Sequence, residues 1–330
     1  MKTRVLGKDL KVSAIGLGCM GFSHASGAPT ERTEAQRAIR QAEEMGYSFF
    51  DTAECYTGLY ADGSISYNEE LVGEALGPIR DNVVIATKFG VRHAQDKSLI
   101  LNSSPEVIRE SVEGSLRRLR TDRIDLYYQH RIDPKVSAEE VAGTMARLID
   151  EGKIRHWGIS ETDEAYLRRA HAVCPVTAVE NRYSMMARWH ESLFPVLEEL
   201  NIGFVVFSPM ANGFLSGRYD ANSKFEIETD YRSFMPQYTP EGMERGHELL
   251  RFLEQLGEEK CATPAQISLA WMLCKKPWII PIPGSRKPER LKENIRAAEI
   301  SLSHQVISDI DALLDTMDFR VFGGSQRANS

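Results

Sequence analysis

The sequence predicts an α/β protein, a (β/α)8 TIM barrel with an N-terminal β-hairpin and long loops at the C-terminal face. Short runs rich in β-branched and aromatic residues alternate with longer amphipathic segments almost from end to end of the 330-residue chain. Eight such runs can be counted, and eight strand–helix units close most naturally into a barrel. The composition, 42% hydrophobic, is sufficient for a large core. Since α/β barrels of more than about 200 residues routinely form one unit, we expect a single domain over residues 1–330.

The expected elements follow one another in regular order. An opening hairpin is expected in RVLGKDLKV, with its turn at residues 7–9. The eight strands are expected in AIGLG, YSFFDTA, NVVIATKF, RIDLYYQH, IRHWGIS, PVTAVE, IGFVVFSP and WIIPIP. Helices are expected at Glu31–Met45, Glu69–Leu76, Pro105–Leu119, Ala138–Asp150, Glu164–His171, Glu191–Leu200, Pro264–Cys274 and Pro288–Ala298. Start signals support several of these helices, such as Ser104 before Pro105 and Thr263 before Pro264.

Two long stretches interrupt the alternation. Residues 56–67 are Gly-rich and polar, and residues 211–240 form an insertion after the seventh strand. Loops longer than about 12 to 15 residues are usually functional or disordered, and in a barrel the loops of the C-terminal face shape the substrate pocket. The tail after Met317 is expected either to fray or to fold over the same face.

An open doubly wound sheet is the competing topology. It would usually carry a GxGxxG turn between the first strand and the first helix if it bound a dinucleotide. Gly16, Gly18 and Gly21 have this spacing, but the segment FSHASGAPT follows them and no helix is expected to start there. The match is therefore weak, and the barrel is favoured.

Charge and cysteine content exclude several classes of protein. The net charge is −7 and the short Arg and Lys clusters lie beside acids, so no nucleic-acid surface is expected. The five cysteines have no CxxC spacing, which indicates neither a disulfide framework nor a metal site and fits a reducing cytoplasm.

The N-terminus lacks the apolar run of a signal peptide, and no stretch approaches the roughly 18 apolar residues of a membrane span. We expect a cytoplasmic protein with no membrane partner.

Three of the expected strands end at residues that can perform chemistry. Asp51 ends the second, with Tyr56 just beyond it, Lys88 ends the third and His130 the fourth. Each has a structural alternative: a lysine reaching to water, an aspartate capping a turn, a histidine satisfied in the core, or a tyrosine packed in a loop. Catalytic residues of a barrel lie at the C-terminal ends of several strands, so the four together favour a proton-donating site for carbonyl chemistry.

Ordered motifs run from the hairpin to about Ile300. They are DTAECY with NEELVGEAL, ATKFG, YYQHR, GISE, ENRYS, FSPMANGFLSG and IPGSRKPERLKEN. With these motifs the chain resembles the aldo-keto reductases, and it is more similar to the bacterial, plant and fungal branches with an IPG-type NADP motif than to the mammalian aldose-reductase branch. The resemblance implies NADPH-dependent, reversible reduction of aldehydes or ketones to alcohols.

The resemblance also implies roles for the four residues, and chemistry supports them. No side chain supplies a hydride, so a nicotinamide cofactor must. Tyr56 would donate the proton, provided that a nearby cation lowers its pKa from about 10. Lys88 is that cation, and Asp51 would hold it charged and in place. His130 would form a hydrogen bond to the carbonyl oxygen.

By the same resemblance, the second half of the chain binds the cofactor. Ser160 and Glu180 would hold the carboxamide, Phe207 would stack on the nicotinamide, the loop 208–218 would wrap the pyrophosphate and Arg286 would bind the 2′-phosphate, which favours NADPH over NADH. The complete expected set is Ser160, Glu180, Phe207, Ser208, Pro209, Met210, Gly213, Leu215, Gly217, Arg218, Gly284, Ser285, Arg286, Arg290, Glu293 and Asn294.

Three positions depart from the family pattern. Glu180 stands where Gln is usual; a carboxylate accepts hydrogen bonds but cannot donate one to the amide oxygen, so cofactor affinity is expected to be lower or pH-dependent. Glu161 replaces an Asn of the mammalian branch, and Gly284 replaces a Lys, which leaves Arg286 as the main determinant for the phosphate. Cys55 adjoins Tyr56 but is interpreted as a small apolar filler.

Two other functions compete with a reductase. A cofactor-binding regulatory subunit resembling the β subunits of potassium channels would retain the same four residues. A barrel aldolase using Lys88 as a Schiff base would leave GSRKPER unexplained and ranks last.

The substrate, the physiological direction and the oligomeric state are left open. Pocket walls are expected from loops at 19–28, 56–67, 89–102 and 211–240. Met20, Phe22, Phe89, Trp189 and Met210 are expected among the apolar residues of the pocket.

Overall fold

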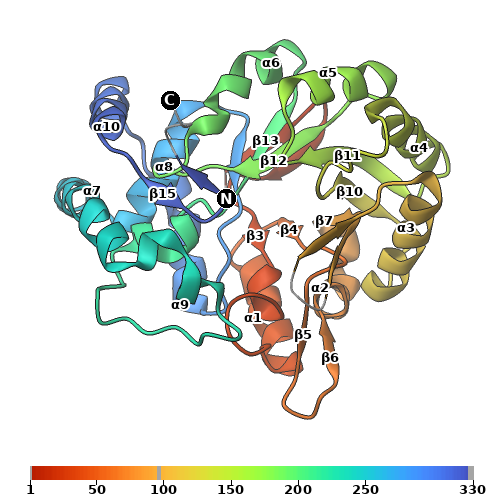
Figure 1. Cartoon of the computed structure of the whole chain (residues 1–330), viewed down its shortest axis with the longest axis horizontal. Coiled ribbons are helices and arrows are strands. Elements are labelled where there is room, and N and C mark those ends of the chain that lie inside the picture. Colours follow the sequence, from red (N-terminus) through yellow and green to blue (C-terminus); the bar gives the residue numbers. More distant parts are fainter. Residues whose placement is uncertain (1, 95–97, 326–330) are drawn as a thin grey trace.

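Eight parallel strands form one curved sheet in the computed structural model, which describes residues 2–94 and 98–325 (Figure 1). In spatial order they are β3 (Leu17–Gly18), β4 (Phe49–Asp51), β7 (Val84–Phe89), β10 (Ile124–Gln129), β11 (Ile154–Ser160), β12 (Ala178–Arg182), β13 (Gly203–Phe207) and β14 (Ile279–Pro281). The first and last strands meet and close the ring. The amide of Gly16, just before β3, donates to the carbonyl of Pro281 in β14 at 3.0 Å. The predicted barrel is confirmed.

The strand register brings the expected reactive residues to one end of the barrel. Asp51 of β4 lies opposite Ala86 of β7, and Lys88 of β7 lies opposite Tyr128 of β10. Ser160 of β11 lies opposite Glu180 of β12. Because all eight strands are parallel, their carboxyl ends share one face, and the loops that follow them surround one mouth.

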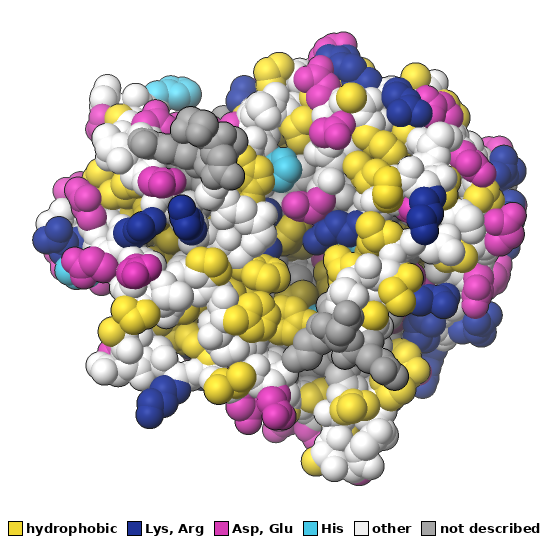
Figure 2. All heavy atoms as spheres, viewed as in Figure 1, with side chains coloured by type: hydrophobic (Ala, Val, Ile, Leu, Met, Phe, Trp, Pro, Cys, Tyr) yellow, Lys and Arg dark blue, Asp and Glu magenta, His cyan; other side chains and the backbone are white. Residues whose placement is uncertain are grey.

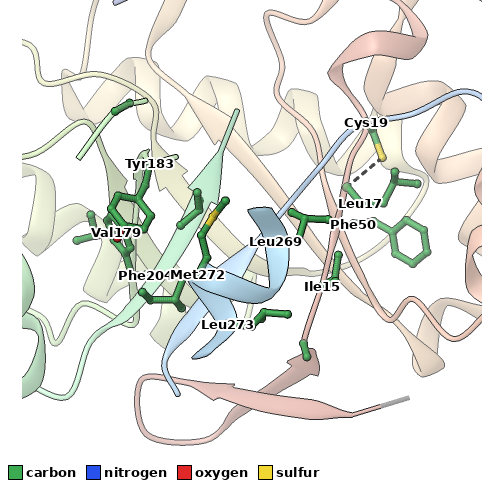
Figure 3. Packing of buried hydrophobic residues seen from close by; sticks show 14 of the residues in the cluster. Ile15, Leu17, Cys19, Phe50, Val179, Tyr183, Phe204, Leu269, Met272 and Leu273 are labelled. Carbon is green, nitrogen blue, oxygen red and sulfur yellow. Dashed lines mark hydrogen bonds between the residues drawn. The ribbon is translucent and has the colours of Figure 1, made fainter. Parts of the chain in front are cut away.

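Helices cover the outside of the sheet (Figure 1). They are α1 (Arg32–Glu44), α2 (Asn68–Leu76), α3 (Pro105–Leu119), α4 (Ala138–Asp150), α5 (Glu164–Val173), α6 (Phe194–Glu199), α8 (Pro264–Lys275) and α9 (Pro288–Arg296). The predicted caps form, since the Ser104 hydroxyl accepts from the Val107 amide and Thr263 and Gln266 make a reciprocal capping box. Figure 3 shows Leu269, Met272 and Leu273 of α8 packed between residues of the seventh and first strands.

The N-terminal hairpin closes the other end of the barrel. Strands β1 (Thr3–Leu6) and β2 (Leu10–Ser13) are joined at Gly7, whose φ of +57° lies in the region that glycine tolerates best. Leu6, Leu10 and Val12 are buried against interior residues of the strands, including Phe49, Leu126 and Val205. A pocket that reaches the strand ends can therefore open only at the opposite face.

Two helices were not predicted from the sequence. The helix α7 (Pro240–Lys260) follows the insertion, and α10 (His304–Thr316) precedes the tail. Leu249, Leu253 and Leu256 form a buried stripe on α7, but Gly242 and Gly246 interrupt its first turns and obscure the periodicity. Gly246 is required there because a Cβ would come within 2.3 Å of the Phe214 ring.

The segments at the mouth contain short elements. Residues 56–67 form the hairpin β5 (Thr57–Leu59) and β6 (Ile65–Tyr67), which projects at the bottom of Figure 1. The strands β8 (Val91–His93) and β9 (Leu99–Leu101) flank residues 95–97, which lie outside the described part of the chain. The 3₁₀ helices are η1 (Met20–Phe22), η2 (Gly77–Asn82), η3 (Trp189–Leu193), η4 (Ala211–Ser216), η5 (Tyr231–Phe234), η6 (Pro236–Tyr238) and η7 (Ala297–Glu299).

The tail folds over the mouth as far as it is described. Its strands β15 (Arg320–Val321) and β16 (Gly324–Ser325) form a small hairpin, and Phe322 between them lines the pocket. Residues 326–330 of the same tail lie outside the described part. Within residues 2–94 and 98–325, every helix is too short or too polar to cross a membrane.

Candidate active site

A pocket of about 750 Å³ lies at the carboxyl ends of the strands. Figure 2 shows hydrophobic side chains around a hollow near the centre of this face, with basic side chains nearby. Asp51, Tyr56 and His130 line the pocket, whereas Lys88 is fully buried beneath it. The four residues expected to perform chemistry are thus brought together.

Lys88 is held by two carboxyl groups. Its Nζ donates to Asp51 Oδ1 at 2.5 Å and to the Thr52 carbonyl at 2.9 Å, and it lies 3.3 Å from Glu180 Oε1. The Asp51 contact was expected, whereas the contact with Glu180 was not. The side chains of Lys88, Asp51 and Glu180 are at most 4% exposed, so their charges interact with little screening by water.

The pKa values of these groups reflect the shared burial. Burial raises the pKa of Asp51, and Lys88 opposes this shift. Burial and the charge of Asp51 raise the pKa of Glu180 to about 8. Burial alone would lower the pKa of Lys88, but attraction to its acidic neighbours, first of all Asp51, outweighs it and leaves that pKa above its ordinary value. Lys88 therefore remains charged at neutral pH.

Tyr56 lies beside the Lys88 ammonium group, which is 5.2 Å from the centroid of its ring. Lys88 acts to lower the pKa of Tyr56, as the sequence led us to expect, but the net shift is upward because burial has the larger effect. Burial raises the pKa of the phenol; Lys88 acts in the opposite direction, and Asp51 and Glu180 offset part of that effect. Tyr56 consequently keeps its proton throughout the neutral range.

His130 is oriented by two neighbours. Its ring lies edge-on to Tyr56 with centroids 5.7 Å apart, and its Nδ1 is 3.5 Å from Cys55 Sγ. Burial lowers the pKa of His130 well below its usual range and raises that of the Cys55 thiol to about 12. In the tautomer with the ring proton on Nε2, Nδ1 is an acceptor and the protonated thiol can donate to it. His130 can then act as a neutral hydrogen-bond donor.

The pocket also contains residues that sequence reasoning did not assign to the site. The His24 ring is stacked 5.9 Å from that of Tyr56, and its Nδ1 lies 2.9 Å from the Thr57 carbonyl. His93 lies 5.0 Å and Tyr231 lies 5.5 Å from His24, ring centroid to ring centroid. All three come from loops that were expected to form the walls, but nothing in the sequence distinguished them from other loop residues.

The second half of the chain supplies the remaining walls. Apart from Leu215 and Gly217, every residue expected to bind the cofactor lines the pocket. Leu215 is buried in the core, and Gly217 ends η4. Arg131 and Arg182, which were not expected, lie 5.9 and 4.9 Å from the centroid of the Phe207 ring. Arg131 also donates to the Ser160 hydroxyl at 3.1 Å.

Several polar atoms in the described part of this half have no hydrogen-bond partner, although other atoms of the same carboxyl groups form ion pairs. Arg290 Nε and Glu293 Oε1 are buried without a hydrogen bond, as is Glu180 Oε2. Ser208 and Asn212 have φ values of +51° and +60° in the tight loop that lines the pocket. Unpaired buried polar atoms of this kind are rare, and they fit an elongated polar ligand such as a dinucleotide.

Arg286 connects two segments across the mouth. Its Nη1 donates to the Ala28 carbonyl at 3.1 Å, and its Nη2 donates to the Ser26 carbonyl. The segment 25–30 also pairs with the insertion, since the Gly27 amide donates to the Thr229 carbonyl at 3.1 Å. We call these contacts among residues 25–30, 226–232 and Arg286 the clasp.

Two residues expected in the walls lie elsewhere. Phe89 packs in the core with Tyr127, ring centroids 5.0 Å apart, because the strand β7 turns that side chain away from the interior of the barrel. Trp189 packs against the core beside Gly324 of the tail. Met20, Phe22 and Met210 line the pocket as expected. In the described ranges, no three His, Cys, Asp or Glu side chains are placed to hold a metal ion.

Comparisons with known proteins agree with this geometry. The model of the family described as Aldo/keto reductase family matches residues 14–315. A probable aldo-keto reductase 1 from Glycine max is 36% identical over 310 residues, which cover 92% of this chain and 86% of that protein.

Solved structures give the same result. A glycerol dehydrogenase from Gluconobacter oxydans has a TM-score of 0.84 at 26% identity, with 96% of this chain and 95% of that chain covered. An aldo/keto reductase from Klebsiella pneumoniae in complex with NADP and acetate has a TM-score of 0.73 at 26% identity, with 100% of this chain and 98% of that chain covered.

Proposed function

Because the chain belongs to the aldo/keto reductase family, we propose that it catalyses the NADPH-dependent, reversible reduction of aldehydes or ketones to alcohols, with residues 1–330 acting as one domain. The observation that carries this proposal is the Lys88–Asp51 ion pair beneath Tyr56 and His130, in the pocket that the expected cofactor residues line. The relative from Klebsiella pneumoniae that was solved with NADP supports the choice of cofactor.

The mechanism assigns one task to each residue. Bound NADPH supplies the hydride. His130, neutral and with its proton on Nε2, donates a hydrogen bond to the substrate carbonyl oxygen and orients it. Tyr56 gives its phenolic proton to that oxygen as negative charge develops there. Lys88 stabilises the phenolate that Tyr56 becomes, and Asp51 keeps Lys88 charged and in place.

The residues of the second half would hold the cofactor. Ser160 and Glu180 are proposed to bind the carboxamide, Phe207 to stack on the ring, and the loop 208–218 to follow the pyrophosphate. Arg286, Arg290 and Glu293 are proposed for the adenosine end, where the unpaired Arg290 Nε and Glu293 Oε1 leave polar groups to be satisfied.

The proposal is tested by following NADPH absorbance with a panel of aldehydes, ketones and sugars. Steady oxidation of NADPH that depends on the carbonyl compound supports a reductase, and the panel would identify the substrate class. If purified protein binds NADPH but turns over none of the panel, and always co-purifies with another chain, the regulatory subunit becomes the better interpretation.

Arg286→Ala is expected to weaken NADPH binding about ten- to a hundredfold more than NADH binding, because only NADPH carries the 2′-phosphate. Loss of the contacts with Ser26 and Ala28 would loosen the clasp and so weaken the binding of both cofactors equally. Fluorescence titration with the two cofactors separates these effects. The control is Arg296→Ala on α9, since Arg296 is exposed and outside the pocket. Equal losses of affinity for NADPH and NADH would mean that Arg286 acts only through the contacts of the clasp and not on the 2′-phosphate.

A further inference from the structure

Glu180 gives the buried site one carboxyl group more than its ammonium group can neutralise. The side chain projects from β12 toward Lys88, with Oε1 3.3 Å from Nζ, while Asp51 Oδ1 lies 2.5 Å from the same Nζ. Asp51 Oδ2 and Glu180 Oε2 are both buried without a hydrogen-bond partner. Two carboxyl groups thus converge on one cation, and each has one oxygen left over.

Among the described residues, the groups in electrostatic contact with Glu180 include one positive charge, that of Lys88. They are Asp51 from β4, Lys88 from β7, Tyr128 from β10 and Tyr56 from the loop after β4. With both carboxyl groups ionised, the cluster would carry a net negative charge at a place where all three charged side chains are at most 4% exposed. Such an uncompensated buried charge is costly, and two adjacent carboxyl groups usually respond by retaining one proton between them.

We propose that Glu180 retains this proton, shared with Asp51, and releases it when a positively charged nicotinamide lies in the pocket. The inference rests on the proposed function, since the nicotinamide ring is a cation in NADP⁺ and neutral in NADPH. Glu180 lines the same pocket as Ser160 and Phe207. A cation nearby favours the ionised carboxylate.

The proton balance of the reaction is closed by this assignment. During reduction, Tyr56 loses its proton to the carbonyl oxygen, and the carbon receives the hydride. Lys88, whose Nζ lies 3.3 Å from Glu180 Oε1 and 5.2 Å from the centroid of the Tyr56 ring, is the route: it gives one of its protons to the Tyr56 phenolate and takes the proton of Glu180 in its place. Glu180 is left as a carboxylate while the oxidised cofactor would occupy the pocket, and it regains a proton from water after NADP⁺ leaves.

Glu180→Gln is the decisive variant, because it keeps the shape of the side chain but cannot ionise. Without cofactor, the folded wild type holds a proton on Glu180 up to about pH 8, whereas the unfolded chain loses it near the ordinary value of 4.5. The folded state therefore binds more protons in this window, and its stability decreases as the pH rises through it. We expect the melting temperature of the wild type to fall between about pH 5.5 and about pH 8.5, and that of Glu180→Gln to fall much less.

Cofactor binding gives a second, independent readout. We consider the ratio of the dissociation constants for NADP⁺ and NADPH, because any pH dependence that comes from the phosphates shared by the two cofactors cancels in this ratio. As the pH rises from about 6 to about 9, the wild type is expected to shift about tenfold in favour of NADP⁺, because a neighbouring cation typically lowers a carboxyl pKa by at least about one unit. In Glu180→Gln the ratio is expected to stay constant.

Glu161→Gln is the matched control. Its carboxyl oxygen accepts from the Arg182 amide at 2.8 Å, a bond that the amide oxygen of Gln preserves, and Glu161 does not line the pocket. Wild-type and Glu180→Gln melting curves with the same pH dependence would overturn the shared proton. A wild-type binding ratio that is independent of pH would overturn its release to the oxidised cofactor. A wild type that binds neither cofactor would refute the proposed function, and the melting curves would still decide whether Glu180 holds the proton.

Discussion

Tyr56→Phe is expected to lose about 10²- to 10⁴-fold in turnover, the usual contribution of a general acid. Phenylalanine keeps the ring against His130 and beside Lys88 but has no proton to give to the carbonyl oxygen. NADPH affinity, measured by fluorescence, should stay near the wild-type value, because the hydroxyl is proposed to act on the substrate and not on the cofactor. The separation of turnover from binding is what identifies a donor.

Tyr60→Phe serves as the control for this variant. Tyr60 lies on the same loop, and its hydroxyl accepts a hydrogen bond from Ser66 at 3.0 Å within the hairpin β5–β6. Its loss should leave turnover close to that of the wild type. Turnover of Tyr56→Phe within a few-fold of the wild type would remove Tyr56 from the role of proton donor.

Lys88→Met is expected to destabilise the fold by about 3 to 5 kcal/mol, because removal of one partner leaves buried carboxyl groups without compensation. Asp51 and Glu180 would then be forced toward their neutral forms, so the variant should lose further stability as the pH rises and these groups must ionise. Turnover should also fall by orders of magnitude, since no cation would stabilise the Tyr56 phenolate. Urea unfolding at two pH values and steady-state kinetics measure both effects.

Two further variants make the interpretation of Lys88→Met specific. Lys153→Met removes a lysine that pairs with Glu113 at 2.5 Å but is 31% exposed, and such surface pairs contribute under about 1 kcal/mol. The double variant Lys88→Met with Glu180→Gln should regain part of the stability by removing one of the two stranded carboxyl groups. Equal stabilities for Lys88→Met and Lys153→Met would mean that the buried cluster contributes no more than a surface ion pair.

The sequence was sufficient to identify the barrel and to bring four reactive residues to one face. Parallel strands place their carboxyl ends together, so Asp51, Lys88 and His130 at the ends of successive strands had to meet. The contact between Glu180 and Lys88 could not be predicted in the same way. It depends on the tilt and register of β7 and β12, which are not neighbours in the sheet, and these determine which interior side chains touch.

Other features depend on contacts between distant segments. The clasp joins Arg286 to Ser26, 260 residues away, and no local pattern indicates such a contact. The pKa of Tyr56 was expected to be lowered because the sequence identified the neighbouring cation but not the degree of burial, which has the larger effect. The helix α7 was missed because glycines interrupt its apolar stripe.

The first and last strands of the barrel, β3 and β14, must meet before activity can appear. The residues proposed to react all precede residue 131, and those proposed to hold the cofactor begin at Ser160, so each half of the chain contains only part of the enzyme. The Gly16 amide and the Pro281 carbonyl, 3.0 Å apart, join the two halves. During synthesis on the ribosome, the first strand must wait for the eighth before the ring can close. Catalytic competence should therefore arise as a single late event, and fragments cut between the halves should be inactive alone and regain activity only when they reassemble.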